Sequence, residues 1–186
     1  MLFRRLHRLH KQREHATLEV IITEVQEGLR MGFISRQELQ TFDFSQSVVL
    51  SMKQKPDAFQ ITVSDVIISA GNSQNQELRS MGTNEMKITW EQVSEFYFLL
   101  DGYTLYNMDD TIAEKTEDTA LSKEEYEPLF SSLKEAPIEQ IEQRDGYYFI
   151  YLDTDEQKVS YTIKIKAEQD RTEWERFRNL PSEYRN

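Results

Sequence analysis

Residues 145–166 read DGYYFIYLDTDEQKVSYTIKIK, and the alternation in this stretch decides the fold class that the sequence predicts. From 159 to 166, apolar side chains alternate strictly with Ser, Thr and Lys. An apolar side chain at every second position is typical of an antiparallel strand with one buried face and one wet face. Asp145-Gly146 supplies the turn before the first strand, and the polar run 153–157 supplies the turn between the two strands. We therefore predict that the two halves of this stretch pair as an antiparallel hairpin.

Two further hairpins follow from the same reasoning. Residues 47–53 and 58–69 are rich in Val, Ile, Phe and Thr, and they are separated by a turn-forming Pro-Asp pair. Residues 95–108 predict another hairpin around Asp101-Gly102, because Asp-Gly between β-rich runs is a strong hairpin signal. The apolar spacing over 90–100 also fits a helix that ends at Gly102, and this alternative stays open.

Helices are predicted at three places. Ser122 and Glu125 form a capping box that begins a helix near residues 122–135. Asp170 and Glu173 predict the start of a terminal helix over 171–180. Apolar residues at helical spacing predict a long helix at the N-terminus. The predicted fold is therefore α+β, with this long N-terminal helix, an antiparallel β-sheet of hairpins, and helices packed on one face of the sheet.

The length and the charge distribution predict how the chain is organised. A length of 186 residues suggests one globular domain. Within it we predict a basic-to-amphipathic N-terminal helix over 1–34 and an acidic α+β domain over 35–186. The chain has 22 Lys and Arg against 33 Asp and Glu, a net charge of −11. Residues 1–15 carry five basic residues and one acidic residue, so their net charge is +4 and that of the remainder is −15.

The basic N-terminal segment is a candidate binding element. Its leucines follow helical spacing, which predicts an amphipathic helix, and its cationic side chains are Arg4, Arg5, Arg8, Lys11 and Arg13. Three interpretations stay open: packing on the acidic body of the same chain, docking on an acidic protein, or peripheral contact of residues 1–13 with an anionic membrane surface. No apolar run approaches the roughly 18–20 residues of a membrane-spanning helix. We expect a cytoplasmic protein, with a place at the cytoplasmic face of the membrane as the alternative.

Catalytic signals are sparse. The chain has no Cys, so thiolate chemistry and Cys-ligated metals are excluded, and all three His residues lie within residues 1–15. Glycine-rich loops that bind phosphates or dinucleotides are absent. Because nucleic-acid affinity depends largely on Lys and Arg, the acidic body disfavours binding to DNA or RNA. The sequence predicts no metal ion and no cofactor, and it favours a function without catalysis.

One enzymatic alternative rests on Pro56-Asp57 followed by Glu85-Met86-Lys87 at the start of a strand. This pattern resembles metal-dependent nucleases of the PD-(D/E)xK type, in which two acids hold Mg²⁺ and a lysine lies near the attacking water. The resemblance implies that Asp57 and Glu85 would hold the ion and that Lys87 would serve the water. The negative charge of the body opposes this alternative.

The aromatic residues of the opening stretch supply the preferred hypothesis. Alternation places Tyr147, Phe149 and Tyr151 on one face of their strand, and the residues between them on the other. Either helices cover this face or it contacts a partner; Tyr-rich exposed patches are typical of protein-recognition surfaces. We therefore expect a non-enzymatic protein-binding module, such as an inhibitor, immunity-type, chaperone or adaptor protein, that uses an acidic, aromatic-containing surface. The partner is expected to be a protein, and the sequence leaves the oligomeric state open.

Overall fold

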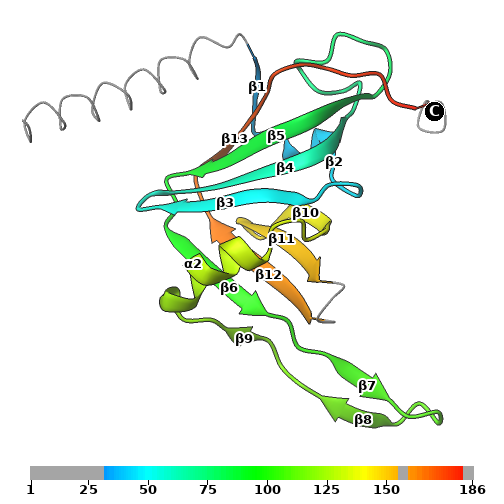
Figure 1. The fold of residues 1–186 in the computed structure, drawn as a ribbon, viewed down its shortest axis with the longest axis vertical. Coiled ribbons are helices and arrows are strands. Elements are labelled where there is room, and N and C mark those ends of the chain that lie inside the picture. The colour runs from blue at the N-terminus through cyan, green and yellow to red at the C-terminus, as the bar shows by residue number, and fades with distance from the viewer. Residues whose placement is uncertain (1–31, 155–158, 182–186) are drawn as a thin grey trace, which may run out of the picture. The chain divides into compact units, whose positions relative to one another are not determined.

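Strands dominate the computed structural model, which describes residues 32–154 and 159–181 (Figure 1). Of these residues, 56% lie in strands and 9% in helices. The first sheet has the order β1-β13-β5-β4, and β2 and β3 share the free edge of β4. Its strands are β1 (Phe33–Arg36), β2 (Phe42–Asp43), β3 (Val49–Lys55), β4 (Ala58–Ile68), β5 (Met81–Glu91) and β13 (Gln169–Trp174).

The second sheet has the order β10-β11-β12-β6-β9, and every pairing in it is antiparallel. Its strands are β6 (Glu95–Leu100), β9 (Thr119–Ala120), β10 (Ile138–Arg144), β11 (Tyr147–Thr154) and β12 (Val159–Lys166). The β11–β12 pair confirms the hairpin predicted from residues 145–166, and the β3–β4 pair confirms the hairpin predicted for 47–69.

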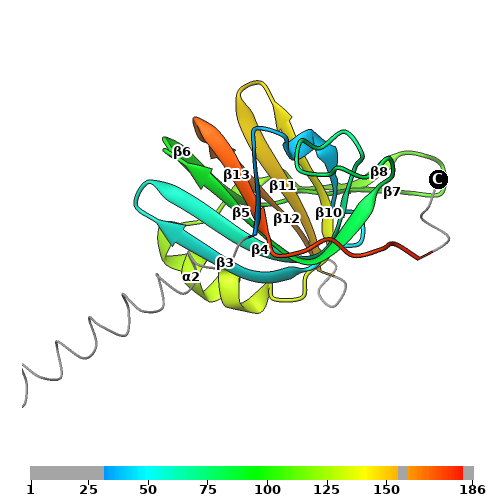
Figure 2. The same ribbon diagram turned by 90° about the horizontal axis from the view of Figure 1, so that it is seen from above.

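The chain passes between the two sheets at two adjacent places, and it is paired with itself on both sides of each passage. β5 leads into β6 and β12 leads into β13, so Glu91 pairs with Gln169 in the first sheet and Glu95 pairs with Lys166 in the second. Gln92 turns the chain between them with a φ of 56°. The Ser94 N–H donates to the Lys166 carbonyl at 2.8 Å, which keeps both strands together at this corner. The two sheets therefore form one curled sheet (Figure 2).

A short seam between β3 and β10 closes the other side of the curl. The Val49 N–H donates to the Ala136 carbonyl at 2.9 Å, and the Glu135 N–H donates to the Val49 carbonyl at 2.7 Å. The Ile138 N–H donates to the Ser47 carbonyl at 2.9 Å. Because the strands bond only over this stretch, the rest of the interior needs another cover.

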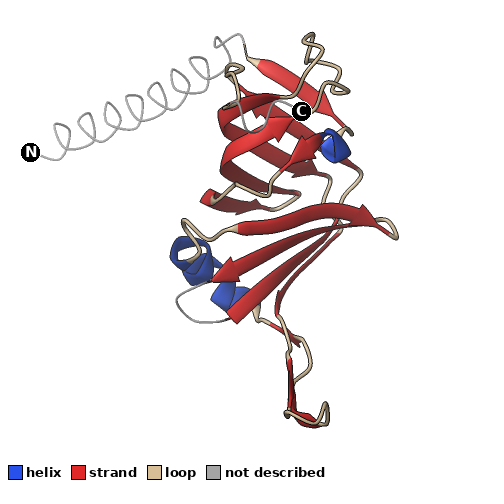
Figure 3. Cartoon of the chain, turned by 90° about the vertical axis from the view of Figure 1, so that its right-hand side faces the viewer, coloured by secondary structure: helices blue, strands red, loops and turns tan. Residues whose placement is uncertain are grey.

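The helix α2 (Lys123–Ser132) supplies that cover (Figure 3). It confirms the helix predicted near 122–135, and Glu125 accepts a hydrogen bond from the Ser122 N–H at 2.7 Å, as the capping box predicts. The Phe130 ring lies 5.9 Å from that of Phe59 in the first sheet and 6.1 Å from that of Phe98 in the second. The helix therefore joins the cores of both sheets.

The predicted α+β fold is wrong, since the described residues are mostly β and contain one α-helix of 10 residues besides the 3₁₀ turn η1 (Leu39–Thr41). The terminal helix expected over 171–180 is also wrong, because Gln169–Trp174 forms β13 between β1 and β5. Of the long N-terminal amphipathic helix expected over 1–34, residues 33 and 34 belong to β1, and residues 1–31 lie outside the described residues. No helix within the described ranges is long and apolar enough to cross a membrane.

The hairpin expected around Asp101-Gly102 is replaced by a longer excursion. β6 pairs with β12 and β9, and the next strands, β7 (Thr104–Tyr106) and β8 (Ile112–Lys115), pair only with each other. We call residues 101–118 the arm. Figures 1 and 3 show the arm projecting from the second sheet. The Asp-Gly step therefore marks the root of the arm and not the tip of a hairpin.

One carboxyl group lies in the core. Asp170 is 2% exposed, and its Oδ2 accepts a hydrogen bond from the Tyr148 hydroxyl at 3.1 Å. Its Oδ1 has no hydrogen-bond partner among the described residues. Burial raises the pKa of Asp170 above its ordinary value, and burial beside this carboxyl also raises the pKa of Tyr148. Burial therefore favours the protonated form of Asp170.

We expect Asp170→Asn to gain stability relative to the wild type as pH rises from about 4 to about 7. A raised pKa in the folded state means that the stabilising contribution of Asp170 is fully present below the pKa of the unfolded carboxyl, about 3.9. That contribution is lost as pH rises through the folded pKa. Chemical denaturation over this range measures the difference, and Tyr148→Phe, which removes the hydroxyl donor, should steepen the loss. Parallel stability curves for the wild type and Asp170→Asn would contradict the assignment.

At the root of the arm, the backbone approaches position 102 so closely that there is no space for a Cβ atom. A Cβ added there would overlap the Thr116 carbonyl oxygen and lie 2.7 Å from the carbonyl carbon of Glu117. We expect Gly102→Ala to separate the two strands of the arm at the root, because overpacking against backbone costs about 1–3 kcal/mol. Hydrogen exchange over 103–116 should accelerate while the two sheets stay protected. Gly71→Ala is the control, since its Cβ would meet only Ser69 Oγ at 3.7 Å; equal exchange in both variants would refute the prediction.

Candidate protein-contact surface

The predicted aromatic residues lie together on the outer side of the second sheet. Tyr147, Phe149 and Tyr151 are half-buried there, whereas Tyr148, Ile150 and Leu152, which alternate with them, are 0–2% exposed and face the core. Among the described helices, α2 packs on the inner side, against Phe98. We call this outer surface the aromatic face; it consists of Glu95, Tyr97, Glu142, Arg144, Tyr147, Phe149, Tyr151, Lys164 and Lys166.

The rings of the aromatic face form a row along β11. The ring centroids of Tyr147 and Phe149 lie 6.4 Å apart, and those of Phe149 and Tyr151 lie 6.2 Å apart with their planes 10° from parallel. Lys164 stands opposite Phe149 on β12, and its Nζ lies 4.2 Å from the Tyr147 ring centroid. Tyr97 of β6 stands on the other side of Lys164 and is 42% exposed. The ammonium group therefore lies among aromatic rings that attract a cation.

Carboxylates hold the ends of these side chains in place. Glu95 accepts hydrogen bonds from the Tyr147 hydroxyl and from Lys166 Nζ, each at 2.9 Å. The Lys166 hydrogen bond lowers the pKa of Glu95, and the hydrogen bond to Glu95 raises the pKa of Tyr147. These contacts keep the carboxylate ionised and the phenol neutral. The ring of Tyr147 is therefore fixed without its hydroxyl having to bond water.

A second carboxylate repeats this arrangement at the β10 edge. Glu142 accepts a hydrogen bond from the Tyr151 hydroxyl at 3.0 Å and pairs with Arg144 at 3.4 Å. Burial, followed by this hydrogen bond, raises the pKa of Tyr151. The Arg144 guanidinium lies 4.8 Å from the Phe149 ring centroid. Each cation of the aromatic face except Lys164 is therefore paired with a carboxylate, and Lys164 has no ion pair with a described residue.

Acidic side chains gather beyond the aromatic row and not within it. Burial raises the pKa of Asp101, and the nearby carboxylates of Asp118 and Glu139 raise it further, while a hydrogen bond from Thr162 opposes them. Thr162 stands opposite Tyr151 on β12. The outer side of the second sheet is therefore aromatic with paired charges at one end and negative at the other.

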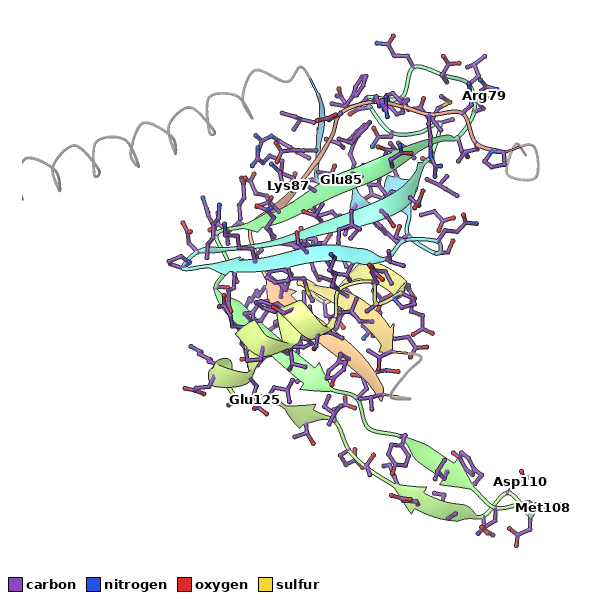
Figure 4. The ribbon with its side chains drawn as sticks, in the orientation of Figure 1. Arg79, Glu85, Lys87, Met108, Asp110 and Glu125 are labelled. Carbon is purple, nitrogen blue, oxygen red and sulfur yellow. The ribbon has the colours of Figure 1, made fainter. Side chains whose placement is uncertain are left out.

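The three residues of the nuclease pattern do not lie together. Ala58, next to Asp57, pairs with Glu91, whereas Glu85 pairs with Ser64 six positions further along β4. At about 3.3 Å per residue this offset corresponds to roughly 20 Å. Figure 4 shows Glu85 and Lys87 on β5, and Lys87 Nζ is paired with Glu173 at 3.0 Å. No group of three or more acidic side chains in the described part of the chain is placed to hold a metal ion.

A shallow cleft of about 160 Å³ adjoins the aromatic face at Glu95. Phe59 and Phe96 are among the residues that line it, and Lys55 and Lys123 add two exposed cations. The Ser94 hydroxyl in this cleft donates to the Lys166 carbonyl at 3.3 Å. That hydroxyl is therefore bonded to backbone and not to a side chain that could act as a general base.

The rings of this surface were predicted from strand alternation, whereas the charged groups around them were not. Lys164 and Lys166 occupy the wet positions of β12, and the β11–β12 register places Lys164 opposite Phe149. Strand alternation and hairpin register could have predicted that contact. Glu95 could not be predicted in this way, because its place depends on the pairing of β6 with β12, two strands that are far apart in the sequence. The basic candidates Arg4, Arg5, Arg8, Lys11 and Arg13 lie outside the described residues.

No protein-family model, no curated protein and no solved structure matches the chain.

Proposed function

We propose that the chain is a non-enzymatic protein-binding module that holds its partner on the aromatic face. The observation that carries this proposal is the row formed by Tyr147, Phe149 and Tyr151 on the side of the second sheet opposite α2. Tyr and Arg side chains dominate the binding energy of many protein interfaces. Here Arg144 lies against the middle ring of the row.

The ordering of these side chains in the free protein favours binding. The hydroxyls of Tyr147 and Tyr151 are bonded to Glu95 and Glu142, so their rings lose little rotamer freedom when a partner arrives. Immobilising a rotamer-rich side chain on binding costs about 0.5–1.5 kcal/mol. A face that is already ordered avoids most of that cost and keeps its ring surfaces for contact.

Charge suggests how a partner would be oriented. Lys164 lies among the rings and has no ion pair with a described residue, so a partner carboxylate would find a cation at the centre of the face. Asp101 and its acidic neighbours lie at the far end, where a basic side chain of the partner would be favoured. The expected partner thus presents an acidic and a basic group on either side of an apolar contact.

The other functions expected from the sequence have less support. The nuclease alternative needs Asp57 and Glu85 at one ion, and the β4–β5 register separates them. Nucleic-acid binding is opposed by a net charge of −15 outside residues 1–15. Peripheral membrane contact through residues 1–13 stays a prediction, because that segment lies outside the described residues. A cytoplasmic location is part of the proposal.

The proposal predicts that Phe149→Ser combined with Tyr151→Ser abolishes capture of the partner by the full chain. Proteins retained by the tagged wild type are identified by mass spectrometry, and one is purified to measure its dissociation constant. Loss of two central rings should raise this constant by at least about 30-fold, since hot-spot side chains contribute about 2 kcal/mol or more. Ile34→Ser with Leu78→Ser is the matched control, because it removes two exposed apolar side chains that belong neither to the aromatic face nor to the arm.

Two results would count against the proposal. The first is an unchanged dissociation constant for the Phe149 and Tyr151 variant whose circular dichroism matches the wild type. The second is Mg²⁺-dependent cleavage of DNA or RNA by the wild type that Asp57→Ala abolishes, which would establish the nuclease alternative.

A further inference from the structure

Hydrogen bonds join the two strands of the arm at its root, although the arm has little contact with the two sheets. The Gly102 N–H donates to Asp118 Oδ1 at 2.9 Å, and the Thr116 N–H donates to the Tyr103 carbonyl at 2.8 Å. At the tip, Asp109 Oδ1 accepts a hydrogen bond from the Thr111 hydroxyl at 2.6 Å. The arm therefore has a defined shape that the core does not impose.

Large apolar side chains are concentrated on the arm. Five of the eight exposed large hydrophobic residues in the described part of the chain belong to it: Tyr103 (49%), Leu105 (50%), Tyr106 (64%), Met108 (107%) and Ile112 (59%). Figure 4 shows Met108 and Asp110 at its tip. Exposed apolar side chains that cluster in this way mark interaction surfaces. None of them belongs to the hydrophobic core, so a docked partner would bury apolar surface that the described fold leaves exposed.

The charge of the arm restricts the chemistry of that partner. Residues 101–118 contain six acidic residues and one lysine, a net charge of −5. The lysine, Lys115, is paired with Glu117 at 2.6 Å. The remaining charge is entirely negative and surrounds the apolar side chains. A complementary segment must therefore be basic and must carry several apolar side chains.

Such a segment occurs in this chain. Residues 1–15 have a net charge of +4 and include Leu2, Phe3, Leu6 and Leu9. We propose that the arm of one copy binds residues 1–15 of a second copy. This contact uses a different surface from the aromatic face and does not depend on the function proposed for that face.

The position of β1 favours a second copy over the same chain. Figures 1 and 3 show β1, the first described strand, at the opposite end of the curled sheet from the arm. The chain thus enters the described fold at the end away from the arm. Contacts between unlike surfaces of identical copies are head-to-tail, and they repeat along a chain of copies unless they close into a ring. The proposal thus predicts concentration-dependent association into a reciprocal dimer, a larger ring or an open chain of copies.

Site-specific cross-linking tests the contact directly. The chain has no cysteine, so Leu6→Cys and Met108→Cys introduced in separate full-length copies report their contact without background. After the two variants are mixed and oxidised, we expect a disulfide that joins position 6 of one copy to position 108 of the other, identified by peptide mass spectrometry. It should be several-fold more abundant than the product of Leu6→Cys with Glu127→Cys on α2. Equal amounts of the two products would overturn the proposal.

Charge reversal tests whether the complementary charges carry the association. Asp110→Lys with Glu117→Lys spares the carboxylates of Asp109 and Asp118, which accept hydrogen bonds within the arm, and breaks only the exposed ion pair of Glu117 with Lys115. Sedimentation should show association weakened by at least about tenfold, and Arg4→Glu with Arg5→Glu should have the same effect. Combining both pairs should restore association in part, whereas Glu124→Lys with Glu127→Lys on α2 should leave it unchanged.

The same experiments distinguish the competing occupants. A wild-type protein that stays monomeric at high concentration and, with both cysteines in one chain, forms a disulfide within that chain would show that the segment binds its own arm, which overturns the proposal. Association that persists after both reversals made separately would also overturn it. Neither result bears on the aromatic face, whose variants leave the arm and residues 1–15 unaltered.

Discussion

The corner shared by two strand pairs is the constraint on which the rest of this structure depends. β5 and β12 turn together into β6 and β13, and the antiparallel ladder continues through the turn from Glu91 and Gln169 to Glu95 and Lys166. A one-residue slip on either strand would move every side chain of that strand to the opposite face. The corner therefore fixes at once which rings enter the core and which form the aromatic face.

Packing follows from this constraint. Phe59 from the first sheet and Phe98 from the second are both 0% exposed, and the ring of Phe130 in α2 lies about equally far from each. Fully burying a large apolar side chain stabilises a protein by about 1.5–3 kcal/mol. The helix is short, but it covers the part of the interior that the three backbone hydrogen bonds of the seam do not.

Local sequence patterns predicted the two hairpins in which apolar alternation and turn signals agree. β11 buries Tyr148, Ile150 and Leu152, and the paired part of β12 buries Tyr161, Ile163 and Ile165. β13 was mistaken for a helix because its buried positions are Asp170, Thr172 and Trp174, and two polar residues on the inner face conceal the alternation. Burial of polar side chains is decided by tertiary contacts, here including the Tyr148 hydroxyl, which a local pattern does not contain.

The candidate surface, too, was predicted only as far as local sequence patterns determine it. Alternation alone placed Tyr147, Phe149 and Tyr151 on one side of their strand. The identity of that side as outer depends on β6, whose pairing with β12 joins residues that are more than 60 positions apart in sequence. An Asp-Gly step next to β6 favoured a local hairpin instead, and the glycine is required for another reason, the close backbone approach of Glu117 at the root of the arm. The Asp-Gly pair is typical of a local hairpin turn, but here the glycine serves a contact with backbone more than ten residues further along the chain.

The two-stranded arm has a consequence for the behaviour of the protein in solution. Both β7 and β8 have an outer edge that pairs with no other strand in the described part of the chain. Open edges beside apolar side chains can recruit strands from other molecules and lead to aggregation. The net charge of −5 on residues 101–118 counters this by electrostatic repulsion between arms, which dissolved salt screens. The tendency of the protein to aggregate thus depends on a hairpin that contributes no side chain to the hydrophobic core.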